Sequence, residues 1–535
     1  MKTKKLLSML LVFAMCLTML AACGGGGDKD TSGGSKAAGD TKAPASAAED
    51  GGNGSTQAAS GDVETVVFAM MASKNAPEGI QMVEDAINEI TESKIGVHVK
   101  LEPIGMANYT QQVGLMMSGG EQLDIVTMLG TYSQMLAKNQ LKGLNDLLDQ
   151  YGQGTKEALG ADFLKSTTNK GEIYALPCVN GKAAVMNIVL RKDLVDELGL
   201  NLDDLKLAEN IDEYFENMDV LTGWFEKIHA AHPEMVCLVP GSAGNNMMFN
   251  TRLPFIDNLN DYYGVLTPDS VDGDKLTVTN LFETEEFRRG CEYAHDWYQK
   301  GYILQDASTT TEAANTFIQS GRSAGYFITG EEGQAEQITT ATGVEMVAVK
   351  LVKPYLTTTD VNGIAFGISS TSEHPEAAMK FLNETYTNAD IVNLLDWGIE
   401  GVHYEVQDDG TVDFPEGVTA ENTTYGLNQD WMFGNQFLSK IWGKGRDTTV
   451  YERLEANNKS AQFSPANGFS YDSTAVRSEL TALSNVYSEY MPGLNTGTLS
   501  PDEIDAFNAA LESAGLDTVI KEKQAQLDAW LAENK

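Results

Sequence analysis

The chain has 535 residues, with 76 Asp and Glu against 37 Lys and Arg, and a formal charge of −39 at pH 7. So acidic a surface argues against nucleic acid and anionic lipid headgroups as partners. The length exceeds what one hydrophobic core usually holds, so two lobes are expected.

The first 22 residues are predicted to be a signal peptide. Three lysines lie among the first five residues, residues 6–20 are mostly apolar, and the stretch ends Leu20-Ala21-Ala22-Cys23. This ending resembles a bacterial lipobox, in which the cysteine thiol takes a lipid and becomes the new N-terminus; the alternative is an ordinary secretory signal. We expect Cys23 to be lipidated, and the mature chain to lie on the extracellular face of the cell membrane with the lipid as its membrane anchor.

Residues 24–61 are predicted to be a disordered tether that begins at the lipidated residue. The segment is rich in Gly, Ser, Ala and Asp and has no large apolar side chain. Such a composition cannot bury enough surface to offset its chain entropy. As a flexible coil it would span about 35 Å.

The folded part starts with alternating strand and helix patterns. Residues 63–70 predict a strand, apolar residues at spacings of three and four predict a helix from residue 80, and alternation over residues 95–101 predicts a second, parallel strand. A helix at 109–117, a strand at 124–129 and a helix at 141–148 follow. These elements predict an open α/β lobe.

The later chain repeats strand and helix patterns without an internal repeat. Residues 183–190 form a largely apolar run, strands are predicted at 323–328 and 364–368, and a hairpin pairs 403–406 with 411–414 across Asp-Asp-Gly. The predicted helices cover 211–230, 285–299 with Thr284 as N-cap, 375–386, and a C-terminal segment that starts after Ser500.

Several of these stretches together resemble family 1 extracellular solute-binding proteins, the receptors of carbohydrate ABC importers. They include the lipobox, the first βαβ unit and the segments Gly-Glu-Gln-Leu-Asp-Ile at 120–125, Gly-Glu-Ile-Tyr-Ala-Leu-Pro at 171–177, Arg-Lys-Asp-Leu at 191–194, Trp-Tyr-Gln-Lys-Gly-Tyr-Ile at 297–303 and His-Pro-Glu-Ala-Ala at 374–378. The length, with residues 397–404 and 433–436, is similar to the long lipoprotein subgroup of Gram-positive bacteria. The resemblance rests on the order and spacing of these segments from about residue 63 to the end.

The resemblance implies an α/β, two-lobe periplasmic-binding-protein-like fold (type II) with an interlobe cleft and a hinge. Residues 63–178 with about 360–405 would form the N-terminal lobe, and residues 185–353 with about 425–535 the C-terminal lobe. The chain would cross between the lobes at 177–184, at about 354–363 and somewhere in 405–428. A ligand is then trapped as the hinge closes.

A sugar site needs aromatic platforms for ring faces and polar side chains for hydroxyl groups. Such residues follow predicted strands or border the later crossings. We predict the ligand-binding residues to be Asn75, Thr131, Tyr132, Thr329, Glu331, Trp397, Glu400, Asn428, Asp430 and Trp431. Each residue could instead have a purely structural role. A tryptophan could lie in the core, the Asn in a turn, the tyrosine could point outward, and the glutamate could pair with a nearby Lys or Arg.

The resemblance implies a receptor without catalytic residues, which binds an oligosaccharide or another small solute and meets ABC importer permease subunits as a monomer. A receptor for a peptide, polyamine or metal, and a lipid-anchored glycan-degrading enzyme, are the alternatives. The sequence has no GxSxG, HExxH or P-loop motif, which argues against the enzyme. No cofactor and no metal site is expected, and Cys178, Cys237 and Cys291 are expected to be buried free thiols, with one disulfide among them as the alternative.

Overall fold

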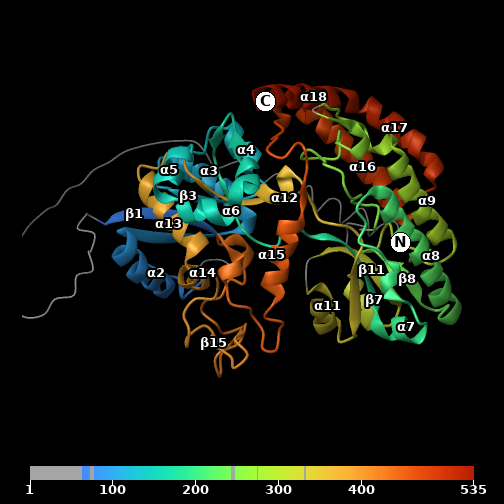
Figure 1. The fold of residues 1–535 in the computed structure, drawn as a ribbon, viewed down its shortest axis with the longest axis horizontal. Coiled ribbons are helices and arrows are strands. Elements are labelled where there is room, and N and C mark those ends of the chain that lie inside the picture. Colours follow the sequence, from blue (N-terminus) through green and yellow to red (C-terminus); the bar gives the residue numbers. More distant parts are fainter. Residues whose placement is uncertain (1–62, 73–76, 242–247, 274, 331–332, 535) are drawn as a thin grey trace, which may run out of the picture. The chain divides into compact units, whose positions relative to one another are not determined.

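The computed structural model describes residues 63–534 apart from 73–76, 242–247, 274 and 331–332 (Figure 1). The predicted signal peptide, Cys23 and the tether lie outside the described residues. None of the helices in the described ranges is long and apolar enough to cross a membrane.

The first sheet has five strands in the order β2-β1-β3-β14-β6. The strands β1 (Glu64–Ala72), β2 (Val97–Gly105) and β3 (Ile125–Leu129) are parallel, whereas β14 (Ile364–Ile368) runs antiparallel to both β3 and β6 (Leu176–Pro177). The predicted βαβ unit is therefore confirmed. Its helix α2 (Ile80–Ile95) ends at Gly96, whose φ of 68° lies in the left-handed region.

Helices cover both faces of this sheet. Along β1, Val66, Phe68 and Met70 pack into one buried cluster and Ala69 and Met71 into another, because successive side chains of a strand point to opposite faces. The first cluster includes residues of α2, α5 (Asn145–Tyr151), α6 (Gln153–Lys165), α13 (Pro375–Thr387) and α14 (Ala389–Asp396); the second includes residues of α3 (Tyr109–Gly119) and α4 (Tyr132–Ala137). A strand buried on both sides explains the continuous apolar run at the start of the fold.

The second sheet has four strands in the order β12-β7-β11-β8. The strand β7 (Val185–Arg191) is antiparallel to β11 (Ser323–Gly330) and to β12 (Met346–Lys350), and β8 (Val236–Val239) is parallel to β11. The helices α8 (Ile211–Ala231) and α9 (Glu285–Gln299) share one cluster with this sheet, and α10 (Ala314–Gln319) and α11 (Gln334–Thr342) share the other. As predicted, Thr284 caps α9 by accepting a hydrogen bond from the Phe287 amide at 3.2 Å.

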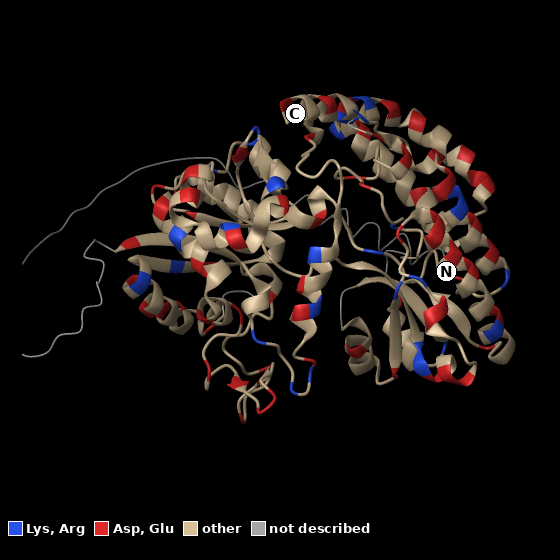
Figure 2. Ribbon diagram, viewed as in Figure 1, with Lys and Arg blue, Asp and Glu red and all other residues tan. Residues whose placement is uncertain are grey.

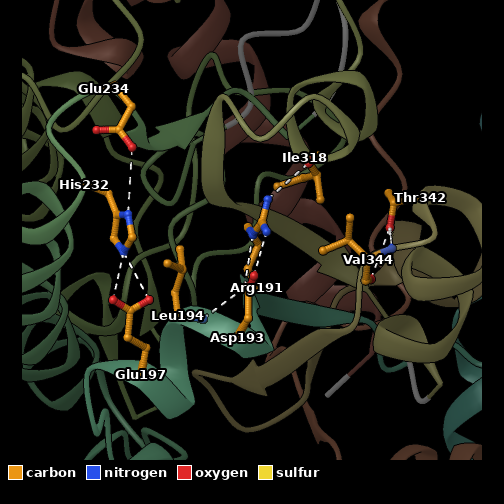
Figure 3. A network of polar contacts seen from close by, with 9 residues as sticks. All are labelled: Arg191, Asp193, Leu194, Glu197, His232, Glu234, Ile318, Thr342 and Val344. Carbon is orange, nitrogen blue, oxygen red and sulfur yellow. Dashed lines mark hydrogen bonds and ion pairs between the residues drawn. The ribbon is translucent and has the colours of Figure 1, made fainter.

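The Arg-Lys-Asp-Leu segment of the sequence starts the helix α7 (Lys192–Glu197) and has a structural role (Figure 3). Arg191 forms an ion pair with Asp193 at 2.6 Å, and the Asp193 carboxylate accepts a hydrogen bond from the Leu194 amide at 2.9 Å. The hydrogen bond from the Arg191 guanidinium, together with its positive charge, holds the pKa of Asp193 below its usual range. Nearby, His232 lies 3.2 Å from Glu197.

The C-terminal helices complete the second lobe. Three helices follow residue 476: α16 (Arg477–Thr496), α17 (Ile504–Ser513) and α18 (Leu516–Glu533), with buried residues such as Leu483, Phe507 and Leu527 in the same cluster as β7 and α8. Lys523 of α18 is fully buried and pairs with Asp261 at 2.6 Å.

Two crossings between the lobes lie side by side. The strand β13 (Tyr355–Leu356) pairs with β17 (Gln462–Phe463), and the helix α12 (Thr358–Asn362) follows β13. The helix α15 (Val450–Ser460) is fastened to the first crossing, because the Asn458 amide accepts hydrogen bonds from the backbone of Lys182 and Ala183 and donates one to the Asn180 carbonyl at 2.6 Å.

The third crossing differs from the expected position in 405–428. Tyr425, Leu427 and Phe433 pack into the core of the first sheet, and the chain joins the second core only from Ala466 onward. Residues 425–433 therefore pack with the first sheet and residues from 466 onward with the second, while α15 between them contacts both lobes. Local spacing carries no information on which core an irregular segment joins.

The remaining strands are short pairs, β4 (Thr168–Asn169) with β5 (Glu172–Ile173), β9 (Val271–Asp272) with β10 (Lys275–Leu276), and β15 (Glu405–Val406) with β16 (Val412–Asp413). The last pair confirms the predicted hairpin. Cys178, Cys237 and Cys291 are buried and free, as predicted.

Candidate functional site

The strand ends of each sheet gather at one edge. In the first sheet β3 ends at Leu129, which pairs with Ile364 at the start of the antiparallel strand β14. In the second sheet β11 ends at Gly330, which pairs with Val185 at the start of β7. The strand β12 ends at Lys350, which pairs with Asn187 of β7. Ligands of open α/β sheets bind beyond the carboxyl ends of strands, so these edges and their loops are the candidate site.

A small cavity of about 60 Å³ lies at the edge of the second sheet and contacts α12. Thr329 lines it together with Met186, Arg252 and Asp360. Arg252 and Asp360 form an ion pair at 2.5 Å, and the Asp360 carboxylate raises the pKa of Arg252. The cavity therefore places the predicted residue Thr329 beside a charged pair that the sequence analysis did not identify.

A larger cavity of about 670 Å³ has polar walls from both lobes. Gly130, Ser133 and Lys138 line it from α4 and the residues on either side of that helix, and Asp472 and Arg477 line it from the start of α16 and the segment before it. Ser133 and Ser470 share a hydrogen bond of 2.7 Å between their hydroxyl groups. Hydroxyl, amide and charged groups on both walls suit a ligand rich in hydroxyl groups.

Two predicted residues lie next to this cavity, with different exposure. Thr131 is half-buried and lines a neighbouring cavity of about 40 Å³ with Tyr109 and Gln140. Tyr132 is 3 % exposed, and its hydroxyl donates to the Thr167 carbonyl at 2.7 Å. Tyr132, predicted to bind the ligand, is therefore buried in the core of the first lobe.

The loop at Asp430 and Trp431 is held by contacts on two sides. The Trp431 indole is half-buried against the cluster that contains Met128 and Met432. The backbone carbonyl of Trp431 accepts a hydrogen bond from the side-chain amide of Asn180 at 2.8 Å. Asp430 accepts hydrogen bonds from the Tyr451 hydroxyl and from the Trp431 backbone. The loop thus presents a partly accessible aromatic face beside a carboxylate.

A second carboxylate lies beside Asp430. Asp396 is fully buried and accepts a hydrogen bond from the Gln429 backbone N–H at 2.5 Å, whereas its other oxygen has no hydrogen-bond partner among the residues that the structure describes. Burial, and then the charge of Asp430, raise the pKa of Asp396 well above its usual range. Burial also raises the pKa of Asp430, against the opposing effect of the Tyr451 hydrogen bond.

Trp397 is a core residue, which corrects our prediction. It is 3 % exposed, lies in a small cluster with Tyr404 and Val412, and stacks on Trp442 with ring centroids 4.8 Å apart. Its indole N–H donates to Ser439 Oγ and to the Lys440 carbonyl, both at 3.1 Å. A tryptophan with its face covered and its N–H paired has no surface left for a sugar ring.

The other predicted residues are exposed or lie outside the described residues. Glu400 is exposed in the turn that precedes Tyr404, and Asn428 is exposed with a left-handed φ of 55°. Asn75 and Glu331 lie outside the described residues. Of the ten predicted residues, the structure places Thr131, Thr329, Asp430 and Trp431 at or near the strand edges.

The residues that sequence reasoning missed are mainly charged ones, among them Arg252, Asp360, Arg446 and Tyr451. Arg446 belongs to the segment Gly443-Lys444-Gly445-Arg446, a basic run in an acidic chain that would have been a usable signal. Arg252 and Asp360 are far apart in sequence, and only the fold brings them together. Within the ranges that the structure describes, His, Cys, Asp and Glu form no group of three or more that could hold a metal ion.

A family model for bacterial extracellular solute-binding proteins matches residues 75–390, more than half of the chain. The chain belongs to this family. A second model, a domain of unknown function (DUF3502), matches residues 465–532 of this solute-binding protein, which are the residues after the third crossing, including α16, α17 and α18.

Similar proteins extend along nearly the whole chain. A carbohydrate ABC transporter substrate-binding protein of Streptococcus pneumoniae serotype 4 is 24 % identical over 90 % of this chain and 94 % of its own length. The crystal structure of the N-glycan transport solute-binding protein NgtS from Streptococcus pneumoniae aligns with a TM-score of 0.70 at 22 % identity, covering 88 % of this chain and all of that one. The complex of NgtS with Man1GlcNAc aligns with a TM-score of 0.59 at 22 % identity and the same coverage.

A solute-binding protein from Bifidobacterium longum subsp. infantis aligns with a TM-score of 0.61 at 16 % identity, over 89 % of this chain and all of that one. Together with the sheet topology, these structures confirm the predicted two-lobe α/β fold of the type II class.

Proposed function

We propose that this protein is an extracellular receptor that captures an oligosaccharide between its lobes and delivers it to an ABC importer. This proposal rests mainly on the polar cavity of about 670 Å³, whose walls come from α4 on one lobe and from residues 471–477 on the other. A ligand in that position contacts both lobes, so its binding favours a closed arrangement. The relatives' names, which refer to carbohydrate and N-glycan transport, support the saccharide class.

Hinge closure is supported by the alignments with one neighbour. NgtS aligns with a TM-score of 0.59 in its complex with Man1GlcNAc and of 0.70 in its other crystal structure. A rigid rotation of one lobe lowers a global alignment score without changing either lobe.

The proposed site includes the Asp430–Trp431 loop, Thr131 and Thr329, and extends to Asn75, Glu331, Glu400 and Asn428. Half-buried Trp431 provides an aromatic face, and Asp430 provides oxygens for hydroxyl groups. The two threonines lie next to cavities at the edge of each sheet. Saccharide recognition requires this combination of an apolar face for the sugar ring and a polar rim for its hydroxyl groups.

We also propose that Cys23 carries the lipid, that the tether holds the receptor close to the membrane, and that the receptor acts as a monomer. Replacement of Cys23 by Ser should release the folded domain from the membrane fraction without loss of ligand binding. A variant that remains anchored after removal of the leader would contradict the lipid anchor. Light scattering of the Cys23→Ser protein without its leader measures the molar mass and so tests whether the receptor is a monomer.

The binding function is tested by titration calorimetry and small-angle X-ray scattering with a panel that includes Man5GlcNAc, kestose and short peptides. We expect an uncleaved saccharide to bind and the radius of gyration to decrease on saturation. Binding of peptides alone would overturn the saccharide class. Release of shorter products would overturn the assignment as a receptor without catalysis.

A further inference from the structure

The loop at residues 255–264 of the second lobe adopts a backbone conformation that its residues rarely take. Phe255, Leu259 and Asn260 have φ angles of 62°, 47° and 86°. They are three of the six non-glycine residues with positive φ in the part of the chain that the structure describes. Such conformations are costly for large side chains, and they persist only where the surrounding structure fixes them, often at functional sites.

Asn260 brings this loop to the polar cavity of about 670 Å³ between the lobes. It lines the cavity together with Tyr471 and Asp472 on the second lobe and with Ser133 and Lys138 on the first. Asn260 is exposed. Its side-chain amide has two donors and one acceptor oxygen, so it can bind two neighbouring hydroxyl groups of a sugar at once.

A buried lysine holds the end of the loop. Figure 2 shows Asp and Glu along α16, α17 and α18, but Lys523 of α18 is 0 % exposed. Its Nζ lies 2.6 Å from the carboxylate of Asp261, the residue after Asn260, and donates to the Gly264 carbonyl at 2.8 Å. The Asp261 carboxylate also accepts a hydrogen bond from the Tyr263 N–H at 2.8 Å. Lys523 therefore fixes the path of the chain directly after Asn260.

The start of the loop is fixed by a second buried carboxylate. Asp257 is 2 % exposed and accepts a hydrogen bond from the Leu259 N–H at 2.9 Å. The Asn260 N–H in turn donates to Asn258 Oδ1 at 3.1 Å. The backbone of Asn260 is thus held from both sides, while its side chain lies at the cavity.

The same helix also fixes the other second-lobe segment of the cavity wall. Gln526, one turn after Lys523, accepts a hydrogen bond from the Asp472 N–H and donates one to the Asp472 carbonyl, both at 2.9 Å. The Lys523 ammonium lies 4.9 Å from the centroid of the Tyr471 ring. One face of α18 therefore sets the position of Asn260 and of residues 471–472 relative to each other.

The ion pair is buried so deeply that each charge depends on the other. Burial lowers the pKa of Lys523 and raises the pKa of Asp261. Removal of one partner alone would leave an uncompensated charge in the core, which destabilises a fold strongly. A test of this pair therefore has to change both residues together.

We propose that Asn260 binds a pair of saccharide hydroxyl groups in this cavity, and that Lys523 is the residue that positions Asn260. This inference rests on the proposed function and identifies a contact that determines its specificity, because an amide distinguishes sugars by the placing of adjacent hydroxyl groups. It also gives the region 465–532, which matches the model of a domain of unknown function, a role in building the second-lobe wall of the site.

The contact is tested with Asn260→Gly, which removes the amide and keeps a residue that tolerates positive φ. Titration calorimetry with Man5GlcNAc and kestose should show an affinity about tenfold lower for whichever saccharide binds the wild type, since two hydrogen bonds are lost. The melting temperature without saccharide should be unchanged. Asn139→Gly is the matched control, because Asn139 is also exposed with a φ of 54° and does not line this cavity.

The positioning role is tested in the double variant Lys523→Met, Asp261→Asn, which removes both charges. Its affinity should fall about fivefold to tenfold, and adding Asn260→Gly should cause little further loss, because residues that act through one another are not additive. A purely structural role of the pair would leave the tenfold effect of Asn260→Gly intact. Lys521→Met, on an exposed position of the same helix, is the matched control. If the double variant does not fold, Asp261→Asn alone, which keeps an acceptor oxygen for Lys523, replaces it in the same cycle.

The outcomes separate this inference from the proposed function. Wild-type affinity of Asn260→Gly for the saccharide that binds would overturn the contact, and an undiminished effect of Asn260→Gly in the double variant would overturn the positioning role. Both results would leave the proposed function intact. Absence of binding by every saccharide would overturn the proposed function and this inference together.

Discussion

Two stretches of this chain look alike in sequence and differ in the structure. Residues 397–401 and 430–434 each combine a tryptophan, a carboxylate and glycine. Trp397 is 3 % exposed and stacks on Trp442, whereas the Trp431 ring is half-buried at the edge of the first sheet. The difference arises because Val412 and Trp442 cover the Trp397 ring, whereas Trp431 packs only in part against the cluster that contains Met128.

The glycines in the two stretches serve the protein's own packing. A methyl group at Gly398 would lie 2.6 Å from His403 Nδ1, and one at Gly434 would lie 2.3 Å from the Thr385 carbonyl. Both residues also have positive φ angles. Permissive glycines beside an aromatic residue therefore indicate a close backbone approach, but they do not indicate whether a ligand or another part of the chain is approached.

The largest expected effect is that of Trp397→Ala. Removal of a core tryptophan should lower the free energy of unfolding by about 3–5 kcal/mol, with a lower melting temperature in the absence of ligand. The fraction that remains folded should bind its saccharide with unchanged affinity. A variant with a normal melting temperature and weakened binding would return Trp397 to the site.

Gly434→Ala should have the next largest effect on stability. The left-handed φ of 73° and the clash with the Thr385 carbonyl together should cost about 3 kcal/mol. Gly401→Ala is the matched control, because Gly401 has a similar φ of 78° with open space around it, and should cost about 1–2 kcal/mol. Chemical denaturation of both variants measures the difference; equal losses would show that the backbone at Gly434 can move aside.

Trp431→Ala should mainly affect binding. Loss of a central aromatic contact typically costs about 2 kcal/mol, equivalent to a reduction in affinity of about thirtyfold. The melting temperature should change less than in Trp397→Ala, because the Trp431 ring is already partly exposed. If Trp431→Ala unfolds as readily as Trp397→Ala and binds normally, the two stretches are equivalent after all.

The smallest effect is expected for Asp396→Asn, and it should be a gain in stability. The folded protein holds the pKa of Asp396 above its unfolded value of about 3.9. The folded state therefore binds more protons than the unfolded state above that pH, and stability falls as the pH rises. Asparagine removes this penalty, so the variant should be more stable by about 1 kcal/mol at neutral pH, with the gain disappearing below about pH 4.

Thermal unfolding of wild type and Asp396→Asn across this pH range provides the measurement. A gain that is constant with pH would exclude ionisation as its cause. A loss at neutral pH would show that the ionised carboxylate of Asp396 stabilises the fold.

Much of the fold followed from local pattern. The apolar spacing of α2, the alternation in β2, the Thr284 cap of α9 and the Asp-Asp-Gly hairpin each depend on neighbours within a few residues. For such features the chemistry of the segment and its conformation are directly linked. The order of these elements was also sufficient to indicate the family.

The site could be predicted only in part, because its geometry depends on long-range contacts. Thr329 lies in β11 one residue before its end, and Trp431 packs beside the end of β3; whether either binds a ligand stays a prediction. The sequence alone could not show that Trp442 covers Trp397, that Tyr132 reaches the Thr167 carbonyl, or that Arg252 meets Asp360.

The sequence by itself was sufficient to establish the acidic character of the chain, the order of its strands and helices, and the resemblance to solute-binding proteins. Tertiary structure decided which core each irregular segment joins, as when Tyr425 and Phe433 pack with the first sheet and Ala466 with the second. It also placed Lys350 of the second sheet near Arg453 of α15. The physical reason is that burial and electrostatic pairing depend on distances in space, which segments far apart in the chain acquire only when it folds.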